Sequence, residues 1–474
     1  MNRPARLSVL AFLFAAIAAQ AQIERFQHVV VVVQENRTPD NLFQGLCSPP
    51  FGSSNSCSAN PNRFQYDIQT SDWLDNTSPT GTTQPGPVAL AAKYDLDHSH
   101  KAFTQMCDLN FEGACQMDAA AKVKCAGTCP AHPQFKYADN STGTLNPYLQ
   151  LATQYGWANY MFQTNQGPSF PAHQFIFGGT SAPSSADDAS AIFASENVSG
   201  TTAGCIATAG TTVLVIGPSS GENQKIYPCF EHETLSDLLQ GFHTSWKYYT
   251  PGAGSIWTAP DAIQHICEPN KPTGGSCVGS EWVSNVVIGE TKVLDDISKC
   301  NLAGVTWIIP SGQNSDHARS NDGGGPDWVA SIVNAIGNQA TCVDGETYWH
   351  DTAILITWDD WGGWYDHEPP QFLTGIQGDY QYGFRVPLIV VSAYTPQGYI
   401  DGQRYDFGSV LRFIERNFGI AEGSLNFADA RTRTDLTSFF NFFAPPRTFH
   451  TISTTRVASD FLNDKTPPTD PDDD

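Results

Sequence analysis

Three short apolar runs of the chain lead into pairs of polar side chains that could bind a ligand or move a proton. The pairs are Glu35 with Asn36 beyond residues 29–33, Asp316 with His317 beyond residues 305–309, and Asp359 with Asp360 beyond residues 353–357. Such runs are typical of strands in a parallel sheet, because both faces of these strands are buried. In open α/β sheets, ligands bind beyond the carboxyl ends of the strands. One pair alone could be a turn or a helix cap, but three pairs together indicate a site.

The residue types in two of these pairs favour a hard divalent cation. Carboxylate and amide oxygens, with no paired His or Cys beside them, suit Mg, Ca or Mn better than a softer metal. Asp359 and Asp360 would point to opposite faces within a strand. Where the strand turns into Gly362 and Gly363, both can reach one ion, or one can bind while the other orients it. Such a cation polarises a phosphoryl oxygen and lowers the pKa of a bound hydroxyl.

A phosphoryl-transfer site also needs a nucleophile, and Ser169 is a candidate. It lies in the segment Gly167-Pro-Ser-Phe-Pro171, where two prolines restrict the backbone around the hydroxyl. Taken alone, the segment is an ordinary loop, and a serine in such a loop more often caps a helix.

Five short motifs occur in order along the chain. They are Gln34-Glu-Asn-Arg-Thr38, Gly167-Pro-Ser169, Ser315-Asp-His317, Thr357-Trp-Asp-Asp-Trp-Gly-Gly-Trp-Tyr-Asp-His-Glu-Pro-Pro370 and Gly383-Phe-Arg-Val-Pro387. Together they resemble the bacterial phosphoesterase family of non-haemolytic-type phospholipases C and secreted acid phosphatases. The later segment Tyr405-Asp-Phe-Gly-Ser409 resembles the Tyr-Asp-x-x-Ser helix start of that family. The resemblance runs from about residue 27 to 420.

The resemblance implies an alkaline-phosphatase-like α/β fold and a role for several residues. It implies one metal ion bound by Glu35, Asn36, Asp359 and Asp360. It also implies that the Ser169 hydroxyl neighbours this metal and attacks phosphorus, which gives a phosphoseryl intermediate that water hydrolyses. Two displacements are each easier than one difficult step, and phosphoryl transfer chiefly requires positioning and charge neutralisation.

Three histidines are candidates for the supporting roles. His98 resembles the histidine of the family's Asp-His-Ser region and is expected to bind phosphate, with His100 as its local rival. His317 resembles the second substrate-side histidine of the family. His265 is a third candidate, although a histidine satisfied by hydrogen bonds away from the site is about as common at such a position. One of the three is expected to protonate the leaving oxygen.

Two features of the chain bear on its substrate. The phospholipase branch of the family commonly reads Pro-Asn-Arg after the nucleophile, whereas this chain reads Pro171-Ala172-His173. A side chain that could contact substrate is therefore lost at Ala172. Phospholipases of the family also often carry extra carboxyl-terminal β-domains, and this chain ends soon after its catalytic motifs. Both features favour an acid-phosphatase-like enzyme with a phosphomonoester substrate.

Other functions remain open on the residues alone. Four aromatic residues cluster beside the expected metal ligands, namely Trp358, Trp361, Trp364 and Tyr365. They could cage a choline ammonium by cation–π attraction, which would favour a phospholipase C acting on a phospholipid headgroup. They could equally form a lid wall or a platform for a sugar or base, and Asp366 with His367 could support the site or simply follow it. A non-catalytic exported binding protein would have lost the nucleophile or a metal carboxylate, and neither is missing.

The order of apolar runs and helical patterns predicts an α/β fold with a mainly parallel central sheet and helices on both faces. Strands are expected at residues 29–33, 212–216, 305–309, 353–357 and 388–391, and helices at 234–241, 328–336 and 409–417. Residues 47–90 and 180–210 are rich in small and turn-forming residues, and we expect disulfide-stapled surface insertions there. Residues 22–445 are expected to form one catalytic domain, followed by a C-terminal segment at 446–474.

The first residues and the cysteines predict an exported protein. Arg3 and Arg6 precede an apolar stretch and the small-residue site Ala19-Gln-Ala21, which indicates a secretory signal peptide at residues 1–21. All 12 cysteines follow it, and an even number in an exported chain implies disulfides, with sequence neighbours as the simplest pairing. Cys125 and Cys129 could be half of a zinc site, but no second half follows. A secreted or periplasmic location is expected.

The charge of the chain limits its partners. The net charge is −23, from 48 acidic and 25 basic residues. Such a field repels polyanions and argues against a nucleic-acid partner and against strong attraction to anionic membranes. After the signal peptide no window reaches the length of a membrane span, so no stable membrane insertion is expected. The tail from about residue 464, rich in proline and aspartate, is expected to be disordered. The oligomeric state and the identity of the metal stay open.

Overall fold

A computed structural model of the chain describes residues 26–469, apart from 219–220, 340–341, 343–346 and 374–379. The expected signal peptide and the last five residues of the acidic tail lie outside the described residues. Within the described part, no helix is both long enough and apolar enough to cross a membrane.

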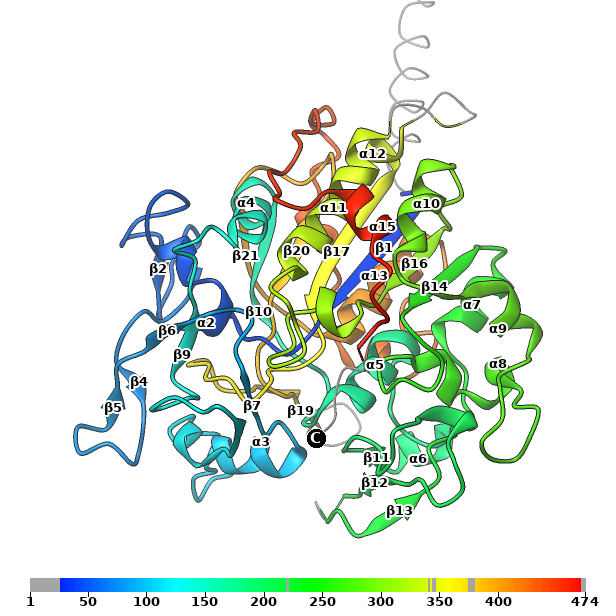
Figure 1. The fold of residues 1–474 in the computed structure, drawn as a ribbon, viewed down its shortest axis with the longest axis horizontal. Coiled ribbons are helices and arrows are strands. Elements are labelled where there is room, and N and C mark those ends of the chain that lie inside the picture. Colours follow the sequence, from blue (N-terminus) through cyan, green and yellow to red (C-terminus); the bar gives the residue numbers. More distant parts are fainter. Residues whose placement is uncertain (1–25, 219–220, 340–341, 343–346, 374–379, 470–474) are drawn as a thin grey trace, which may run out of the picture.

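An eight-stranded sheet forms the centre of the molecule (Figure 1). In spatial order its strands are β15 (Val286–Ile288), β14 (Trp246–Thr250), β16 (Val305–Ile308), β1 (His28–Gln34), β17 (Thr352–Trp358), β20 (Leu388–Val391), β10 (Gly156–Met161) and β21 (Tyr399–Tyr405). Within this sheet only β20 runs against its neighbours, since every other described pairing is parallel. The expectation of a mainly parallel sheet is confirmed.

Four of the five expected strands lie in this central sheet. The fifth, β12 (Val213–Ile216), instead pairs with β11 (Phe193–Ala194) and β13 (Gln224–Ile226) in a separate three-stranded sheet. The sequence patterns miss β10, β14, β15 and β21. The edge strand β21 shows why, because its exposed polar residues interrupt the apolar run that marks a buried strand.

Helices cover both faces of the sheet, as expected (Figure 1). The helices of one face pack against one another and are α4 (Asn146–Gln154), α10 (Lys292–Ser298), α11 (Gly325–Asn338), α12 (Tyr348–Asp351) and α15 (Ala458–Asn463). Those of the other face are α5 (Ser169–Gly178), α7 (Leu235–Gly241), α13 (Phe407–Asn417) and α14 (Ala428–Arg431). The three predicted helices are confirmed as α7, α11 and α13.

Shorter elements lie in the segments between the main strands and helices. The remaining helices are α2 (Pro39–Leu42), α3 (His100–Cys107), α6 (Ser185–Ala189), α8 (Gln264–Cys267) and α9 (Ser280–Asn285). The remaining strands are β2 (Cys57–Ser58), β3 (Tyr66–Asp67), β4 (Trp73–Leu74), β5 (Thr82–Thr83), β6 (Gly86–Val88), β7 (Tyr94–Leu96), β8 (Cys125–Gly127), β9 (Lys136–Ala138), β18 (Phe372–Leu373) and β19 (Tyr380–Gln381). Between β1 and α4 the chain therefore carries only short elements, and this excursion is longer than the predicted insertion.

Six disulfides join cysteines that are neighbours in the sequence, which confirms the simplest pairing. The pairs are Cys47–Cys57, Cys107–Cys115, Cys125–Cys129, Cys205–Cys229, Cys267–Cys277 and Cys300–Cys342. Cys125 and Cys129 are bonded to each other in a small disulfide loop and do not form half of a zinc site. Five of the six join cysteines no more than 24 residues apart, and Cys300–Cys342 spans 42 residues.

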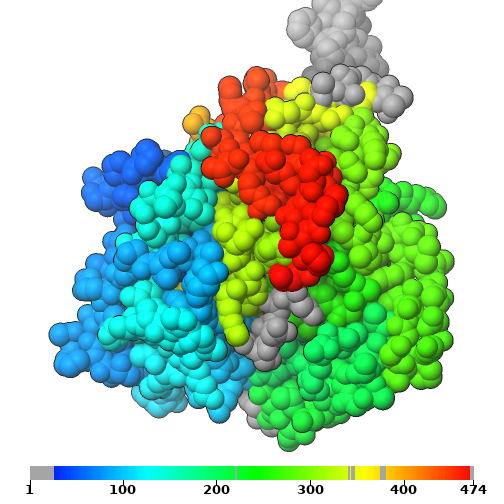
Figure 2. Space-filling model, in the orientation of Figure 1, coloured from blue at the N-terminus to red at the C-terminus, as the bar shows by residue number. Residues whose placement is uncertain are grey.

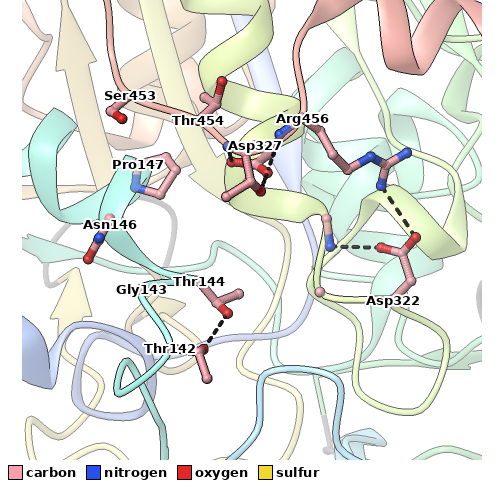
Figure 3. A pocket seen from close by; sticks show the side chains of 13 residues that line it. Thr142, Gly143, Thr144, Asn146, Pro147, Asp322, Asp327, Ser453, Thr454 and Arg456 are labelled. Atoms are coloured by element: carbon pink, nitrogen blue, oxygen red, sulfur yellow. Dashed lines mark hydrogen bonds and ion pairs between the residues drawn. The ribbon is translucent and has the colours of Figure 1, made fainter.

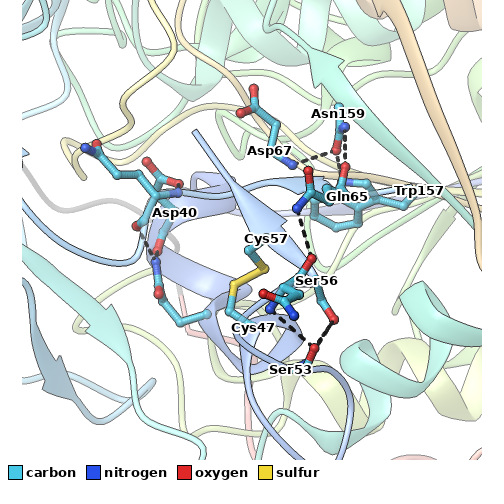
Figure 4. The surroundings of a disulfide bond; sticks show 12 residues. Asp40, Cys47, Ser53, Ser56, Cys57, Gln65, Asp67, Trp157 and Asn159 are labelled. Carbon is cyan, nitrogen blue, oxygen red and sulfur yellow. Dashed lines mark hydrogen bonds between the residues drawn. A yellow bond between two sulfur atoms is a disulfide. The ribbon is translucent and has the colours of Figure 1, made fainter. Parts of the chain in front are cut away.

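The first insertion is also tied to the central sheet by hydrogen bonds (Figure 4). The backbone N–H of Asp67 donates to Asn159 Oδ1 of β10 at 2.9 Å, and the Asn159 amide donates to the Gln65 carbonyl. Trp157 of the same strand donates its indole N–H to Asn159 Oδ1 at 3.0 Å. The Cys47–Cys57 disulfide closes the preceding loop, so both ends of this insertion are fixed.

The C-terminal segment packs on the helical layer of one face. Figure 2 shows it, in red, across the front of the molecule, and α15 packs against α10 and α11. The sequence predicts disorder from about residue 464, whereas Thr469 bonds to Gln313 Oε1 through its backbone N–H at 2.9 Å and accepts from Gly312. Backbone pairing of this kind orders the first part of the tail, because it replaces hydrogen bonds to water.

Candidate active site

The register between β1 and β17 brings two of the polar pairs together. Gln34 lies opposite Trp358, so Glu35 and Asp359 leave neighbouring parallel strands at the same level. The backbone N–H of Asn36 donates to Asp359 Oδ1 at 3.1 Å. All of these side chains are fully buried. Neighbouring strand ends thus place carboxylates and an amide at one point.

The backbone after each strand is bent sharply at this point. Asn36 has a φ of 63°, a left-handed conformation that few residues other than glycine adopt. A Cβ atom at Gly362 would lie 2.5 Å from the Asn36 carbonyl oxygen, so only glycine allows the two turns to approach this closely. Strained backbone of this kind persists where the surroundings hold it, and it is concentrated at functional sites.

Ser169 is the first residue of α5 and points at the carboxylates. Its Oγ donates to Asp360 Oδ2 at 3.3 Å, while Asp360 Oδ1 accepts the Gly362 N–H at 2.7 Å. Ser169 does not cap the helix with its side chain, since Pro168 is the N-cap residue. The Phe170 N–H donates to Asn197 and Pro171 has no N–H, so this end of α5 attracts an anion chiefly through the positive end of the helix dipole. A phosphoryl group on Ser169 would therefore lie against the positive end of α5.

His98 completes the surroundings of Asn36. Its Nδ1 lies 2.8 Å from the Leu96 carbonyl, and its Nε2 lies 3.2 Å from Asn36 Nδ2. Because a carbonyl only accepts, Nδ1 carries the proton of the neutral ring and Nε2 accepts from the amide. The amide therefore directs Oδ1 away from His98. This carbonyl oxygen is the atom with which Asn36 can bind a cation.

His317 and Asp316, which follow β16, face different surroundings. The His317 ring lies 5.8 Å from that of His98, and its Nδ1 lies 2.7 Å from the Ala318 carbonyl. Asp316 Oδ2 instead accepts hydrogen bonds from the Tyr148 hydroxyl at 2.8 Å and the Trp358 indole at 3.0 Å. His317 thus stands beside His98, and Asp316 anchors the loop that carries it.

His173 is a residue of the site that the sequence patterns missed. It is fully buried, and its Nε2 lies 3.2 Å from Glu35 Oε1 and 3.8 Å from Asp359 Oδ2. Burial lowers the pKa of His173 to about 4, so the imidazole is neutral. The signal in the sequence is its position four residues after Ser169, one turn along the same face of α5. The departure noted at Ala172 is thus followed directly by a site residue.

The donor atoms at this point fit a divalent cation. Glu35, His173 and Asp359 each offer a ligand atom, and these atoms lie within 4.8 Å of one another. In the described part of the chain, the buried oxygens Asn36 Oδ1 and Asp359 Oδ2 accept no hydrogen bond. Buried carboxylate oxygens are unfavourable without a compensating partner. A cation bound among them would supply that partner.

A second group of acidic residues is already balanced by cationic side chains. Arg385 pairs with Asp67 at 2.9 Å and with Asp366 at 2.8 Å, and His367 bonds to Asp40 and Asp67. Although burial opposes the charge, the Asp40 and Asp67 carboxylates raise the pKa of His367 to about 10. A protonated imidazole cannot bind a metal. Asp366 and His367 therefore hold the loop after the site against the first insertion.

His265 lies in α8 and is about half buried. Its Nδ1 lies 2.9 Å from Glu231 Oε1, and its Nε2 lies 3.1 Å from Asp237 Oδ1. The hydrogen bonds and charges of these two carboxylates raise the pKa of His265 to about 9. Both ring nitrogens are thus occupied by an ion-pair network. His100, the rival of His98, bonds through Nδ1 to the Gln166 carbonyl at 2.8 Å.

Two hollows differ in their relation to these residues. One of about 330 Å³ lies between the loops at 142–147, 322–327 and 453–456, where Arg456 pairs with Asp322 at 3.3 Å (Figure 3). It contains none of the residues expected to perform chemistry. The other, of about 560 Å³, is lined by His98 and by Pro168, the residue before Ser169. Of these two hollows, the second is therefore the one that adjoins residues expected to perform chemistry.

Comparison with known proteins identifies the family. A profile of the Phosphoesterase family matches residues 26–421. The chain belongs to the Phosphoesterase family. The family predicted from the five motifs is thereby confirmed, and the strand-end pairs, Ser169, His98 and His317 all lie within the matched residues.

The curated relatives of this Phosphoesterase chain are phospholipases C. Phospholipase C B of Mycobacterium tuberculosis is 30% identical over 182 residues, which cover 34% of each chain. Hemolytic phospholipase C of Pseudomonas aeruginosa is 22% identical over 357 residues, which cover 68% of this chain and 44% of the relative. The chain thus matches less than half of the length of either relative. Among solved structures, a protein in the alkaline phosphatase superfamily from Vibrio parahaemolyticus is 11% identical with a TM-score of 0.34, covering 62% of this chain and 66% of that one.

The aromatic cluster of this Phosphoesterase chain is part of the core and not of a binding surface. Trp358, Trp361, Trp364 and Tyr365 are all fully buried. Trp364 carries the Arg37 guanidinium on its ring at 4.8 Å, and Tyr365 stacks on Trp73. The alternative of a choline cage, a lid wall or a base platform built from these rings is not supported, because Trp358 packs on Phe43 and Tyr148, and Trp361 on Phe103 and Phe384.

Proposed function

We propose that the protein is an exported, metal-dependent phosphoric ester hydrolase that forms a phosphoseryl intermediate at Ser169. The observation that carries the proposal is the 3.3 Å hydrogen bond from Ser169 Oγ to Asp360 within a buried cluster of carboxylates. A serine in this position has a carboxylate beside it and a helix N-terminus behind it. Membership of the Phosphoesterase family supports the reaction class.

The cluster would hold one divalent cation of the Mg, Ca or Mn class. The proposed ligands are Glu35, Asn36, Asp359 and Asp360. When bound, the cation polarises the phosphoryl group and neutralises its charge. The neutral His173 donates its Nε2 proton to Glu35 Oε1 and so orients that carboxylate, as residues around metal ligands commonly do.

The protein residues around the cation divide the remaining work. Asp360 accepts the hydrogen bond of the Ser169 hydroxyl and so orients its oxygen toward phosphorus. The rings of His98 and His317 lie 5.8 Å apart, with His98 next to Asn36, and we assign both to the surroundings of the phosphoryl group. Their Nδ1 atoms are fixed by backbone carbonyls, which orients both rings before substrate arrives. His265 supports the fold through Glu231 and Asp237 and takes no part in the reaction.

The proposed substrate is a phosphomonoester, as expected for an acid-phosphatase-like enzyme. The hollow beside Ser169 is lined by polar, charged and aliphatic residues, and its described lining includes no Phe, Tyr or Trp. Recognition of a quaternary ammonium usually relies on aromatic rings. The wall of this hollow therefore favours a leaving group without choline chemistry.

A second candidate function is phospholipase C activity, which the curated relatives favour. In that case phosphorylcholine esters would be cleaved between phosphorus and the alcohol. Release of p-nitrophenol from p-nitrophenyl phosphate and from p-nitrophenyl phosphorylcholine separates the two candidates. We expect the phosphate ester to give the higher kcat/KM, and the opposite order would establish the phospholipase.

The proposed reaction is tested with the metal, the nucleophile and the intermediate in turn. Hydrolysis of p-nitrophenyl phosphate should stop when a chelator removes the metal and return when a divalent cation is added. Acid-quenched enzyme should carry a phosphate on the peptide that contains Ser169, detected by mass spectrometry. Activity that survives in Ser169→Ala, or a phosphate on another residue, would refute the proposed nucleophile.

A further inference from the structure

The hollow beside Ser169 has a carboxyl group on its wall that the proposed mechanism leaves without a role. Glu196 lines this hollow together with His98 and Pro168. It belongs to the loop between β11 and β12, within the second insertion. Lys124 and Cys125 also line it. We place the alcohol group of an ester bound at Ser169 in this space, because Pro168 and His98 line it.

The loop that carries Glu196 is fixed directly to the start of α5. The side chain of Asn197 accepts the backbone N–H of Phe170 at 2.9 Å. On the other side, a Cβ at Gly167 would lie 2.1 Å from the Ser195 carbonyl oxygen, so the two loops are in close contact. The neighbours of Glu196 thus contact the residues on both sides of Pro168 and Ser169. This arrangement fixes the loop that carries Glu196 beside the residues that flank the nucleophile.

The surroundings of Glu196 favour its protonated form. Its Oε1 accepts the backbone N–H of His100 at 3.0 Å, which leaves Oε2 to carry a proton. Burial, together with the nearby carboxylates of Glu222 and Asp97, raises the pKa of Glu196 to about 8. Glu222 is itself held next to this loop by the Ser195 hydroxyl at 2.7 Å. A carboxylic acid at a pocket wall is a suitable general acid at neutral pH.

The two site histidines are less suited to this step. The Nδ1 atoms of His98 and His317 each donate to a backbone carbonyl, so only Nε2 of each ring can face a substrate. Nε2 of His98 already lies 3.2 Å from the Asn36 amide nitrogen. A carboxyl group on the wall of the hollow is a further source of a proton for an alcohol of high pKa.

We propose that Glu196 protonates the leaving-group oxygen, an inference that rests on the proposed function. In the first displacement the Ser169 Oγ–P bond forms, the bond from phosphorus to the alcohol oxygen breaks, and the Glu196 proton moves to that oxygen. The Ser169 proton passes to bulk water. In the second displacement water attacks phosphorus, its proton passes to Glu196, and the Ser169 oxygen takes a proton back from bulk water. The products are the alcohol and inorganic phosphate, and every group ends as it began.

The test compares two esters whose leaving groups differ in their need for a proton. Nitrophenolate is a stable anion and departs without protonation, whereas an alkoxide such as that of glycerol phosphate does not. In Glu196→Gln we expect kcat/KM for glycerol phosphate to fall by about 10²-fold or more relative to that for p-nitrophenyl phosphate. Glu196→Asp, which keeps the acid on a shorter side chain, should recover part of the loss. Glu112→Gln, at an exposed position in the Cys107–Cys115 loop, is the control and should leave both rates as in the natural protein.

Equal losses for the two esters, or no loss for either, would overturn the role of Glu196. A structural defect at the pocket gives the first result, because it slows both reactions alike. These outcomes leave the proposed function standing, since hydrolysis that depends on Ser169 and metal is measured separately. Failure of the natural protein to cleave either ester would instead refute the proposed function.

Discussion

The hydroxyl of Ser169 donates a hydrogen bond to Asp360 across 3.3 Å and so joins two distant parts of the chain. Ser169 begins α5, and Asp360 follows the end of β17. The N-terminus of a helix and the carboxyl end of a strand both meet at this contact. Each supplies what phosphoryl transfer requires, namely the positive end of a helix dipole for an anion and carboxylates for a cation.

Replacement of the nucleophile tests this contact most directly. Ser169→Ala should lower kcat for p-nitrophenyl phosphate by at least about 10³-fold, because no covalent intermediate can form. Metal binding, measured by calorimetry, should persist because the carboxylates remain. Ser190→Ala, at an exposed serine of the second insertion, is the matched control and should retain full activity. A fully active Ser169→Ala enzyme would contradict the mechanism.

Removal of one carboxylate tests the metal site. Asp359→Asn should weaken divalent-cation binding by at least about 100-fold, since even residues around metal ligands commonly change affinity by that much. The measurement is isothermal titration with Mg, Ca and Mn after dialysis against a chelator. Asp295→Asn removes an exposed carboxylate that pairs with Lys299, and it should bind metal as the natural protein does. Unchanged affinity in Asp359→Asn would show that the ion binds elsewhere.

The position of His173 predicts an indirect effect on the same ion. His173→Gln keeps a donor near Glu35 but changes its position, so metal affinity should fall by about 10- to 100-fold. At saturating metal, kcat should recover most of its value, because His173 acts through Glu35. A loss of kcat that metal does not restore would place His173 in direct contact with the reacting groups.

The ion pairs of His265 predict a pH-dependent contribution to stability without an effect on catalysis. The pKa of His265 is raised from 6.5 to about 9 by folding, so its contribution is fully present below pH 6.5 and is lost as pH rises through 9. His265→Gln should therefore lower Tm at pH 6 by a small amount, since the pair is partly exposed, and leave Tm unchanged at pH 10. Activity should stay as in the natural protein. A large loss of kcat would assign His265 to the reaction.

Several elements of the fold could be predicted because their patterns are local. Five consecutive valines predict a strand that is buried on both faces, and all five are fully buried in the structure. Cysteines that are close in the sequence pair with one another, because short loops bring them together readily. The edge strands β15 and β21 lacked such a pattern. The antiparallel direction of β20 also could not be predicted, because an apolar run gives no indication of which way the strand runs.

The sequence by itself determined which chemical groups end the strands and which family the chain belongs to. Only the tertiary structure decided that Glu35 lies beside Asp359, that His173 lies against both, and that the tryptophans are covered. It also placed Glu196, from the second insertion, on the wall of the hollow that His98 and Pro168 line. The physical reason is that strand register, helix facing and the docking of loops depend on contacts between residues far apart in the chain. Those contacts cannot be predicted from local residue patterns.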